Sequence, residues 1–300
     1  MRTFSALTRR NIKLFFRDKG LFFTSLITPM ILLVLYSTFL ANIYEQSFLS
    51  AMPSGMTISD KLLGGLVGGQ LISSLLSVSC VTVAFCSNML MVQDKISGAK
   101  SDFSVTPVSS AALSVSYFTA SFLSTLIICL IAAGAGFLYL SSVGWYLSAS
   151  DIISIIADIL LLTMFGTLLS SIINLFLSSQ GQISAVGSIV SSVYGFICGA
   201  YMPISQFGEG LQKILSFLPG TYATSLFRRH AMGGAIAELR KIGIPSDVIE
   251  GMKDAFDCNI YFFDDIVSES GMYIILGGTV LILLVVFIIL GVFNAKKKQR

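Results

Sequence analysis

Residues 91–108 read M-V-Q-D-K-I-S-G-A-K-S-D-F-S-V-T-P-V, a short charged island between two long apolar segments. Beyond it, residues 103–150 contain no charged residue, and neither do residues 159–208. Each stretch is roughly twice the length of a helix that crosses a bilayer, so each is expected to hold two spans joined by a turn. The turns are predicted at residues 141–146 and 178–182, where Gly, Ser and Gln interrupt the apolar pattern. The island is therefore predicted to be a polar loop between membrane spans.

The composition is typical of a protein in the lipid bilayer. Apolar residues make up 54% of the chain and charged residues 12%, and the mean hydropathy is +0.84. These values exclude an ordinary soluble domain. The pattern predicts an all-α polytopic membrane protein with six transmembrane helices in one domain, residues 1–300. The predicted spans are 21–41, 62–92, 111–140, 152–177, 183–203 and 271–294.

The distribution of Lys and Arg predicts the orientation. Residues 1–20 carry six of them, Lys95 and Lys100 lie in the island, and residues 296–300 carry four. By the positive-inside rule these segments face the cytoplasm, so both termini are predicted to be cytoplasmic, in a bacterial plasma membrane. Residues 204–270 hold most of the acidic residues and are predicted to lie outside, since segments of this length translocate largely regardless of charge.

The first 20 residues differ from both a span and a cleaved signal. Apolar residues such as Leu7 and Leu14 are interleaved with Arg9, Arg10 and Lys13. This pattern predicts an amphipathic helix in the inner membrane interface. A plain basic anchor that orients the first span is an equally good interpretation.

The sequence has few features that are typical of catalytic, nucleotide-binding or metal sites. The sequence contains no G-x-x-x-x-G-K-[ST] phosphate loop and no nucleophile elbow, so the chain is predicted to have no ATPase site and no catalytic residue of its own. Four of the five cysteines fall inside predicted spans and only Cys258 lies outside them, which argues against a disulfide framework. His230 is the only histidine, and no metal site is predicted around it. We interpret His230 as an ordinary polar residue beside Arg228 and Arg229.

Glycines at a spacing of four residues predict close helix packing. Packing within one chain is favoured over a subunit interface. The pairs are Gly64 with Gly68, Gly65 with Gly69, and Gly195 with Gly199.

Two groups of motifs carry a resemblance to a known family. The island contains D-K-x-x-G at residues 94–98 and V-T-P-V at residues 105–108. A second group reads G-A-Y-M-P at 199–203, F-L-P-G-T-Y at 217–222 and L-F-R at 226–228. Their order resembles that of ABC-2 type transporter permeases, in particular the branch that exports drugs and antibiotics. The resemblance implies half a transporter, in which two copies, or this chain and a sister permease, assemble with two cytoplasmic ATP-binding subunits. Those subunits would bind ATP and Mg²⁺, membrane lipids would surround the spans, and nucleic acid is not an expected partner.

The resemblance also implies roles for particular residues. Residues 93–108 would form a coupling loop, in which residues 93–104 would be a coupling helix that lies on the ATPase, although a solvated loop is the better interpretation without the resemblance. The implied coupling residues are Asp94, Lys95, Gly98, Lys100, Asp102, Thr106 and Pro107. Residues 204–270 would form re-entrant outer helices and an extracellular insertion at 235–265, whose role the sequence does not show. The implied outer gate is Met202, Pro203, Pro219 and Tyr222.

The passenger pathway is implied to lie where the first, second and fifth spans meet a second subunit. Its polar lining would be Ser73, Ser77, Thr82, Asn88, Ser188, Ser191 and Tyr194. Such a lining suits a hydrophobic or amphipathic compound, such as a drug, antibiotic, peptide or lipid. Hydrogen bonding between helices explains the same side chains equally well.

Asp158 is the one carboxylate well inside a predicted span, where an ionised group costs about 2.5–3.5 kcal/mol. It could bind a cationic passenger or a proton, but snorkelling or pairing with an external arginine is the preferred interpretation.

Two further functions stay open. One is export of a glycan such as teichoic acid or polysaccharide, although residues 17–22 do not reproduce the R-Y-x-x-S-x-L-G-like start typical of that branch. The other is an ATP-independent, proton-coupled carrier that uses Asp158.

Overall fold

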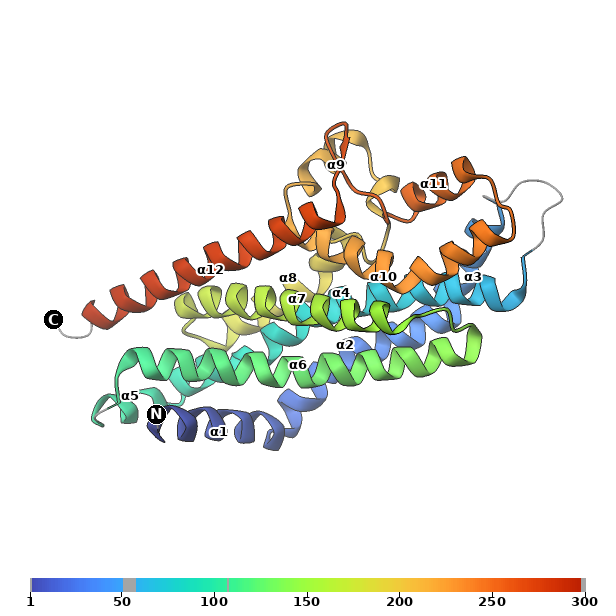
Figure 1. Cartoon of the computed structure of the whole chain (residues 1–300). Helices are drawn as coiled ribbons and strands as arrows, with labels where there is room; N and C mark the ends of the chain where they lie inside the picture. Colours follow the sequence, from blue (N-terminus) through green and yellow to red (C-terminus); the bar gives the residue numbers. More distant parts are fainter. Residues whose placement is uncertain (1, 51–57, 107, 298–300) are drawn as a thin grey trace.

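The computed structural model describes residues 2–50, 58–106 and 108–297. The structure is 84% helical, which confirms the all-α class. Figure 1 shows the long helices lying side by side, with the short helix α5 (Ala99–Ser104), the start of α1 (Arg2–Arg17) and the end of α12 (Glu269–Lys297) at one end of the bundle. The strands in the described part of the chain form a two-stranded antiparallel hairpin of β1 (Tyr261–Phe262) and β2 (Asp265–Ile266).

Helix α4 (Asp60–Ile96) is the centre of the bundle. Its most apolar window is 89% buried, whereas the corresponding window of α12 (Glu269–Lys297) is 17% buried. Helices α6 (Ser110–Val143), α7 (Ala149–Phe176) and α10 (Pro219–Lys241) pack around α4. The apolar residues of α4 therefore form the protein core, while those of α12 remain free to face lipid.

Five helical segments within the described ranges are long and apolar enough to cross a membrane. They are Lys19–Ser50, α4, α6, α7 and α12. The predicted fifth span corresponds to α8 (Gln180–Ile197), which is not among them; it has 18 residues and begins with Gln180 and Gln182. The structure therefore supports a polytopic membrane protein but does not confirm six spans, because the predicted fifth span is not among these five.

The first apolar segment is longer than predicted. It comprises α2 (Lys19–Leu35), a π-helical turn η1 (Tyr36–Leu40) and α3 (Ala41–Ser50), whereas the predicted span ends at residue 41. The helix continues because its last turns bury Phe48, whose ring stacks on that of Phe256 with centroids 3.9 Å apart. Tertiary packing thus stabilises the helix beyond residue 41, where the polar residues of the sequence predicted a loop.

Helix α1 (Arg2–Arg17) is the predicted amphipathic helix. Figure 1 shows that it runs along α6. Leu7 belongs to one apolar cluster with Tyr117 of α6, and Phe15 belongs to another with Ile128. The apolar face of α1 is thus covered by protein, and a position in the membrane interface is not confirmed.

The segment between α8 and α12 is mainly helical. It contains the short helix η2 (Ile204–Gln206), α9 (Glu209–Leu215), α10 and α11 (Ser246–Ala255). The first part of the predicted insertion at 235–265 is the continuation of α10, and the remainder is α11 and the hairpin. This segment is therefore joined to the bundle through α10, which packs on α4, α7 and α12.

The glycines of α4 permit close helix contacts within the chain. A Cβ atom on Gly64 would lie 2.5 Å from the carbonyl oxygen of Val143, and one on Gly69 would lie 2.7 Å from that of Ala231. Neither backbone oxygen can move aside as a flexible side chain would. The glycines thus seat α6 and α10 against α4, and the predicted intramolecular packing is confirmed.

Candidate functional site

The charged island forms a helix–turn–helix element at one end of the bundle. Helix α4 continues through Asp94 and Lys95, Gly98 adopts a positive φ of 83°, and α5 (Ala99–Ser104) follows. A left-handed residue of this kind is most easily a glycine. Ser109 then caps the start of α6 by accepting a hydrogen bond from the backbone of Ala112. Two capped long helices therefore hold the short helix α5 between them.

Asp94 is buried, with 6% of its surface exposed, and it joins three helices. Arg10 of α1 forms an ion pair with it, with a second contact of 3.3 Å from Nη2 to Oδ1. The hydroxyl of Tyr117 on α6 donates a hydrogen bond to the same carboxylate. The Arg10 guanidinium also lies 5.2 Å from the ring centroid of Phe103 in α5. Arg10 therefore connects α1 both to α4 and to α5.

Lys95 binds the end of another helix. Its Nζ donates to the carbonyl oxygens of Asn174, Leu175 and Leu177 at 2.7, 3.0 and 3.0 Å. A lysine at this position satisfies terminal carbonyls of α7 and interacts favourably with the helix dipole. Asp94 and Lys95, predicted to contact the ATPase directly, therefore both have partners inside the chain.

The outer surface of the island is made by other residues. Asp102 and Thr106 are exposed, and Val105 is 88% exposed. The side chain of Lys100 and all of Pro107, two predicted coupling residues, lie outside the described residues. Among the predicted coupling residues whose side chains the structure describes, Asp102 and Thr106 are exposed and could contact a partner protein.

The four predicted pathway residues of α4 lie in the protein core. Ser77 donates to the carbonyl oxygen of Ser73 at 2.7 Å, and Thr82 donates to that of Val78 at 2.9 Å. Asn88 donates to hydroxyls on α7, including that of Ser171 at 2.7 Å. In this conformation these side chains form hydrogen bonds within and between helices. Such bonds were the alternative to a role in lining the passenger pathway.

The predicted pathway residues of α8 are in different surroundings. Ser188 is exposed and Ser191 is partly exposed, whereas Tyr194 is buried. The hydroxyl of Tyr194 has no hydrogen-bond partner among the described residues. The structure therefore leaves Ser188 and Ser191 accessible and does not bring them together with the α4 residues in a common pocket.

The predicted outer-gate residues hold the turns around α9. Pro203 is buried and precedes η2, and Met202 is partly buried. Pro219 begins α10, where a missing N–H is tolerated. The buried Tyr222 donates its hydroxyl proton to the carbonyl oxygen of Ser216. These residues fix the connection from α8 to α10, and whether they act as a gate remains a proposal.

Asp158 has a different partner from the predicted arginine. It is buried, and its Oδ2 lies 2.6 Å from Nδ1 of His230. His230 was interpreted as an ordinary polar residue beside Arg228 and Arg229, and this carboxylate partner was not predicted. Sequence reasoning missed the pair because 72 positions separate the two residues. The available signal was Asp158, a carboxylate well inside the apolar helix α7, whereas His230 lies in α10 among several other ionisable residues.

A second buried ion pair lies on the same helix. Arg228 Nη1 donates to Asp257 Oδ2 at 2.8 Å, and its Nη2 donates to the carbonyl oxygen of Gly199 at 2.5 Å. Asp257 also accepts a hydrogen bond from the backbone of Ser205 at 3.0 Å. The pair joins α10 to the end of α8 and to the segment after α11. Arg228 lies in the L-F-R motif, but nothing in the sequence indicated Asp257 as its partner.

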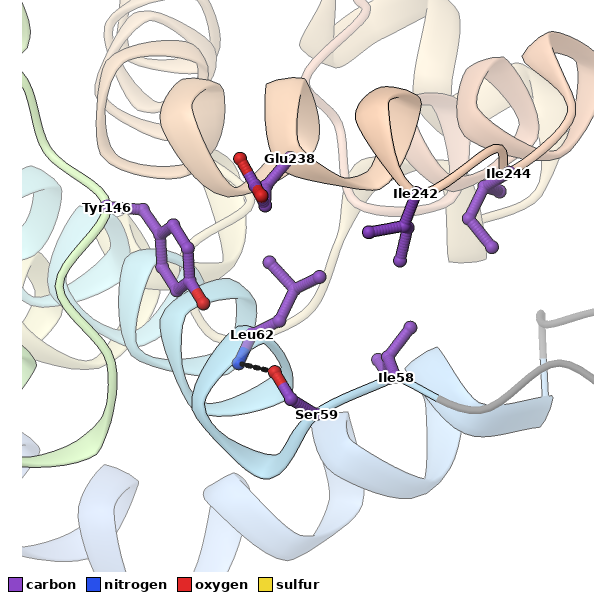
Figure 2. Close-up of a pocket in the computed structure, with 7 residues that line it drawn as sticks. All are labelled: Ile58, Ser59, Leu62, Tyr146, Glu238, Ile242 and Ile244. Carbon is purple, nitrogen blue, oxygen red and sulfur yellow. Dashed lines mark hydrogen bonds between the residues drawn. The ribbon is translucent and has the colours of Figure 1, made fainter.

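A shallow pocket of about 270 Å³ lies at the end of α4 opposite to α5. Figure 2 shows Tyr146 and Glu238 on one side of it and isoleucine side chains on the other. The lining residues are Ile58, Ser59, Leu62, Tyr146, Glu238, Ile242 and Ile244. Glu238 pairs with Lys241 at 2.7 Å, and the lining combines aliphatic side chains with the polar groups of Ser59, Tyr146 and Glu238. None of the predicted site residues lines it.

These features define a polytopic helical membrane protein in which the short, charged helix α5 is anchored at an end of the bundle. No group of three or more His, Cys, Asp or Glu side chains in the described ranges is placed to hold a metal ion. Residues 2–230 match the family model of ABC-2 type transporters. The chain belongs to this family and is an ABC transporter permease. No curated protein and no solved structure matches it.

Proposed function

We propose that the chain is the membrane-spanning subunit of an ATP-driven exporter for a hydrophobic or amphipathic compound. It would work with separate cytoplasmic ATP-binding subunits and a second copy or sister permease, in a bacterial plasma membrane with both termini inside. The partner subunits would bind ATP and Mg²⁺. The observation that carries the proposal is α5, a short helix that carries the exposed Asp102, is followed by the exposed Val105 and is anchored to the bundle in a chain of the ABC-2 family.

The anchoring of α5 supports a mechanical role. Arg10 links α1 to Asp94 at the base of α4 and lies over Phe103 of α5, while Lys95 binds the end of α7. Charge-assisted hydrogen bonds of this kind are stronger and more directional than neutral ones. A displacement of α5 by a motor subunit would therefore move several helices together. In this scheme α8 is the fifth span, and α9 and α10 form the outer helices.

The accessible face of α8 supports the proposed class of passenger. Ser188 is exposed beside the exposed Ile189 and Val193, and Ser191 is partly exposed. A surface that mixes hydroxyls with aliphatic side chains suits an amphipathic molecule. The buried α4 residues would reach the passenger only if the helices separate during the cycle.

Co-purification with a functional readout tests the coupling. The chain, carrying an affinity tag without histidine, is purified from its native membrane in mild detergent, and ATP hydrolysis by the assembly is measured. The variant Lys100→Ala/Asp102→Ala/Val105→Asp changes α5, and Asp247→Ala removes an exposed charge from α11 as a matched control.

We expect the natural chain and Asp247→Ala to retain an ATP-hydrolysing subunit, and the α5 variant to lose it. Reconstituted vesicles should then export an amphipathic dye only when ATP is supplied. An ATPase that stays bound to the α5 variant would overturn the coupling surface. Transport driven by a proton gradient without any ATPase would instead favour the carrier that uses Asp158.

A further inference from the structure

The cluster around His230 brings together three helices that are distant in the sequence. Its Nδ1 lies 2.6 Å from Asp158 of α7, and its Nε2 lies 3.4 Å from Oε1 of Glu269 in the first turn of α12. Tyr273 of α12 donates its hydroxyl proton to Asp158 Oδ1 at 2.7 Å. The rings of Tyr273 and His230 stack with centroids 6.4 Å apart. α12 therefore contacts α7 and α10 through polar groups near its start.

Both ring nitrogens of His230 face carboxylate oxygens. A neutral imidazole carries one N–H and one lone pair, so it can donate to only one of the two carboxylates. Its other nitrogen would then face an oxygen lone pair. The imidazolium form donates from both nitrogens and satisfies both Asp158 and Glu269. The geometry thus favours the protonated ring.

In the part of the chain that the structure describes, no other cation compensates these carboxylates. Within the described residues, Asp158 and Glu269 form ion pairs with His230 alone. On α10 itself, Arg228 binds Asp257 and Arg229 Nε binds the carbonyl oxygen of Cys258. Helix α4, which packs against α10, has no ionisable side chain between Lys61 and Cys80. The charge balance of the cluster therefore depends on whether His230 is protonated.

The cluster has a buried side and an open side. The side chain of Asp158 is 2% exposed and that of His230 is 9% exposed, whereas Glu269 is 53% exposed. A proton can therefore reach the ring from solvent at Glu269, while Asp158 remains inside the protein. Burial lowers the pKa of His230, but hydrogen bonds and negative charge from Asp158 and Glu269 outweigh it and raise the pKa above its ordinary value.

We propose that His230 is a proton-binding site that fastens the start of α12 to α7 and α10: the protonated ring bridges Asp158 and Glu269, and loss of the proton releases Glu269. Since the neutral ring keeps one N–H for Asp158, deprotonation weakens the α12 contact selectively. The site responds to the pH of the compartment that Glu269 faces, which is the exterior in the proposed orientation. It does not depend on the ATP-binding partner.

The chain has one histidine, which makes the test unambiguous. The purified chain is prepared in lipid nanodiscs with isotope-labelled histidine and a histidine-free tag, and the ring nitrogen chemical shifts are followed against pH. These shifts distinguish the imidazolium from either neutral tautomer. We expect a titration whose midpoint lies above the value of about 6.5 for an unperturbed histidine. We also expect hydrogen exchange in the first turns of α12, corrected for intrinsic rates, to become faster above that midpoint.

Two variants and a control complete the experiment. Asp158→Asn should lower the midpoint, and Glu269→Gln, at a half-exposed position that folding tolerates, should lower it by less. Asp264→Asn removes an exposed carboxylate from the hairpin and should leave it unchanged. A midpoint at or below that of free histidine would overturn the proposal. So would a ring that stays neutral throughout, or a midpoint that the Glu269→Gln variant does not move.

Discussion

Asp94 and Asp158 are both buried carboxylates between apolar helices, but they face different cations. Asp94 pairs with Arg10 and accepts a hydrogen bond from Tyr117. Asp158 pairs with His230 and accepts a hydrogen bond from Tyr273. Each site thus combines an aspartate, a tyrosine hydroxyl and one cation. Arginine keeps its charge at any physiological pH, whereas histidine does not. The comparison shows how one arrangement serves as a permanent connection near α5 and as a proton-dependent one at the start of α12.

The largest effect is expected from the arginine pair on the helix that also carries His230. Arg228→Met leaves Asp257 buried without its cation, which typically destabilises a protein by about 3–5 kcal/mol. Because arginine keeps its charge, the loss should be the same between about pH 5.5 and 8.5. The free energy of unfolding in detergent, measured with denaturant at several pH values, checks both statements.

The control for Arg228 is an exposed arginine on the same helix. Arg240 lies 3.5 Å from Glu250, and both side chains are about half exposed. Arg240→Met should therefore change the free energy of unfolding by about 0–1 kcal/mol. Equal effects at the two arginines would contradict the assignment of the Arg228 pair as a buried structural connection.

A smaller, pH-dependent effect is expected at the histidine site. His230→Gln removes hydrogen bonds to charged groups, which are worth about 1.5–3 kcal/mol. Because the pKa of His230 is raised in the folded state, its stabilising contribution is complete below the unfolded pKa of about 6.5 and is lost as pH rises through the folded value. The difference in unfolding free energy between natural chain and variant should therefore shrink at alkaline pH. A constant difference would show that the ring does not titrate in the folded state.

Apart from the Arg240 control, the smallest effect is expected at Arg10. About a third of its side chain is exposed, so solvent screens the pair with Asp94, and Arg10→Met should destabilise the chain by about 1 kcal/mol. The loss should not vary with pH, in contrast to that at His230. The same denaturant titrations measure it. A clear pH dependence at Arg10 would remove the distinction between the two aspartate sites.

The sequence predicted the helical architecture well where the signal was local. Long apolar stretches identified four of the five apolar segments closely, and the turns at 141–146 and 178–182 are present between α6, α7 and α8. The boundary at residue 41 was missed because Phe48 is stabilised by Phe256, a contact between distant residues. The packing of the apolar side of α1 on α6 was not predicted for the same reason.

The candidate site was predicted in part. The island was recognised, but Asp94 and Lys95 were expected to point outward, and the structure shows both bonded within the chain. Charged residues in a short loop look solvated when only neighbours in the sequence are considered. Their actual partners, Arg10 and the end of α7, lie about 80 positions away. Residue type therefore identified the element but not the direction of its side chains.

The sequence by itself determined that this chain is an α-helical membrane protein, because a bilayer demands long apolar helices whatever their neighbours are. It also contained the motifs of the ABC-2 family. Only the tertiary structure decided which ionisable residues meet. Asp158 is a carboxylate inside a predicted span and His230 is the one histidine, but they lie in separate segments, and only the close packing of α10 on α4 and α7 makes them a pair. Electrostatic interactions depend on distance in space and on burial, and the linear sequence fixes neither.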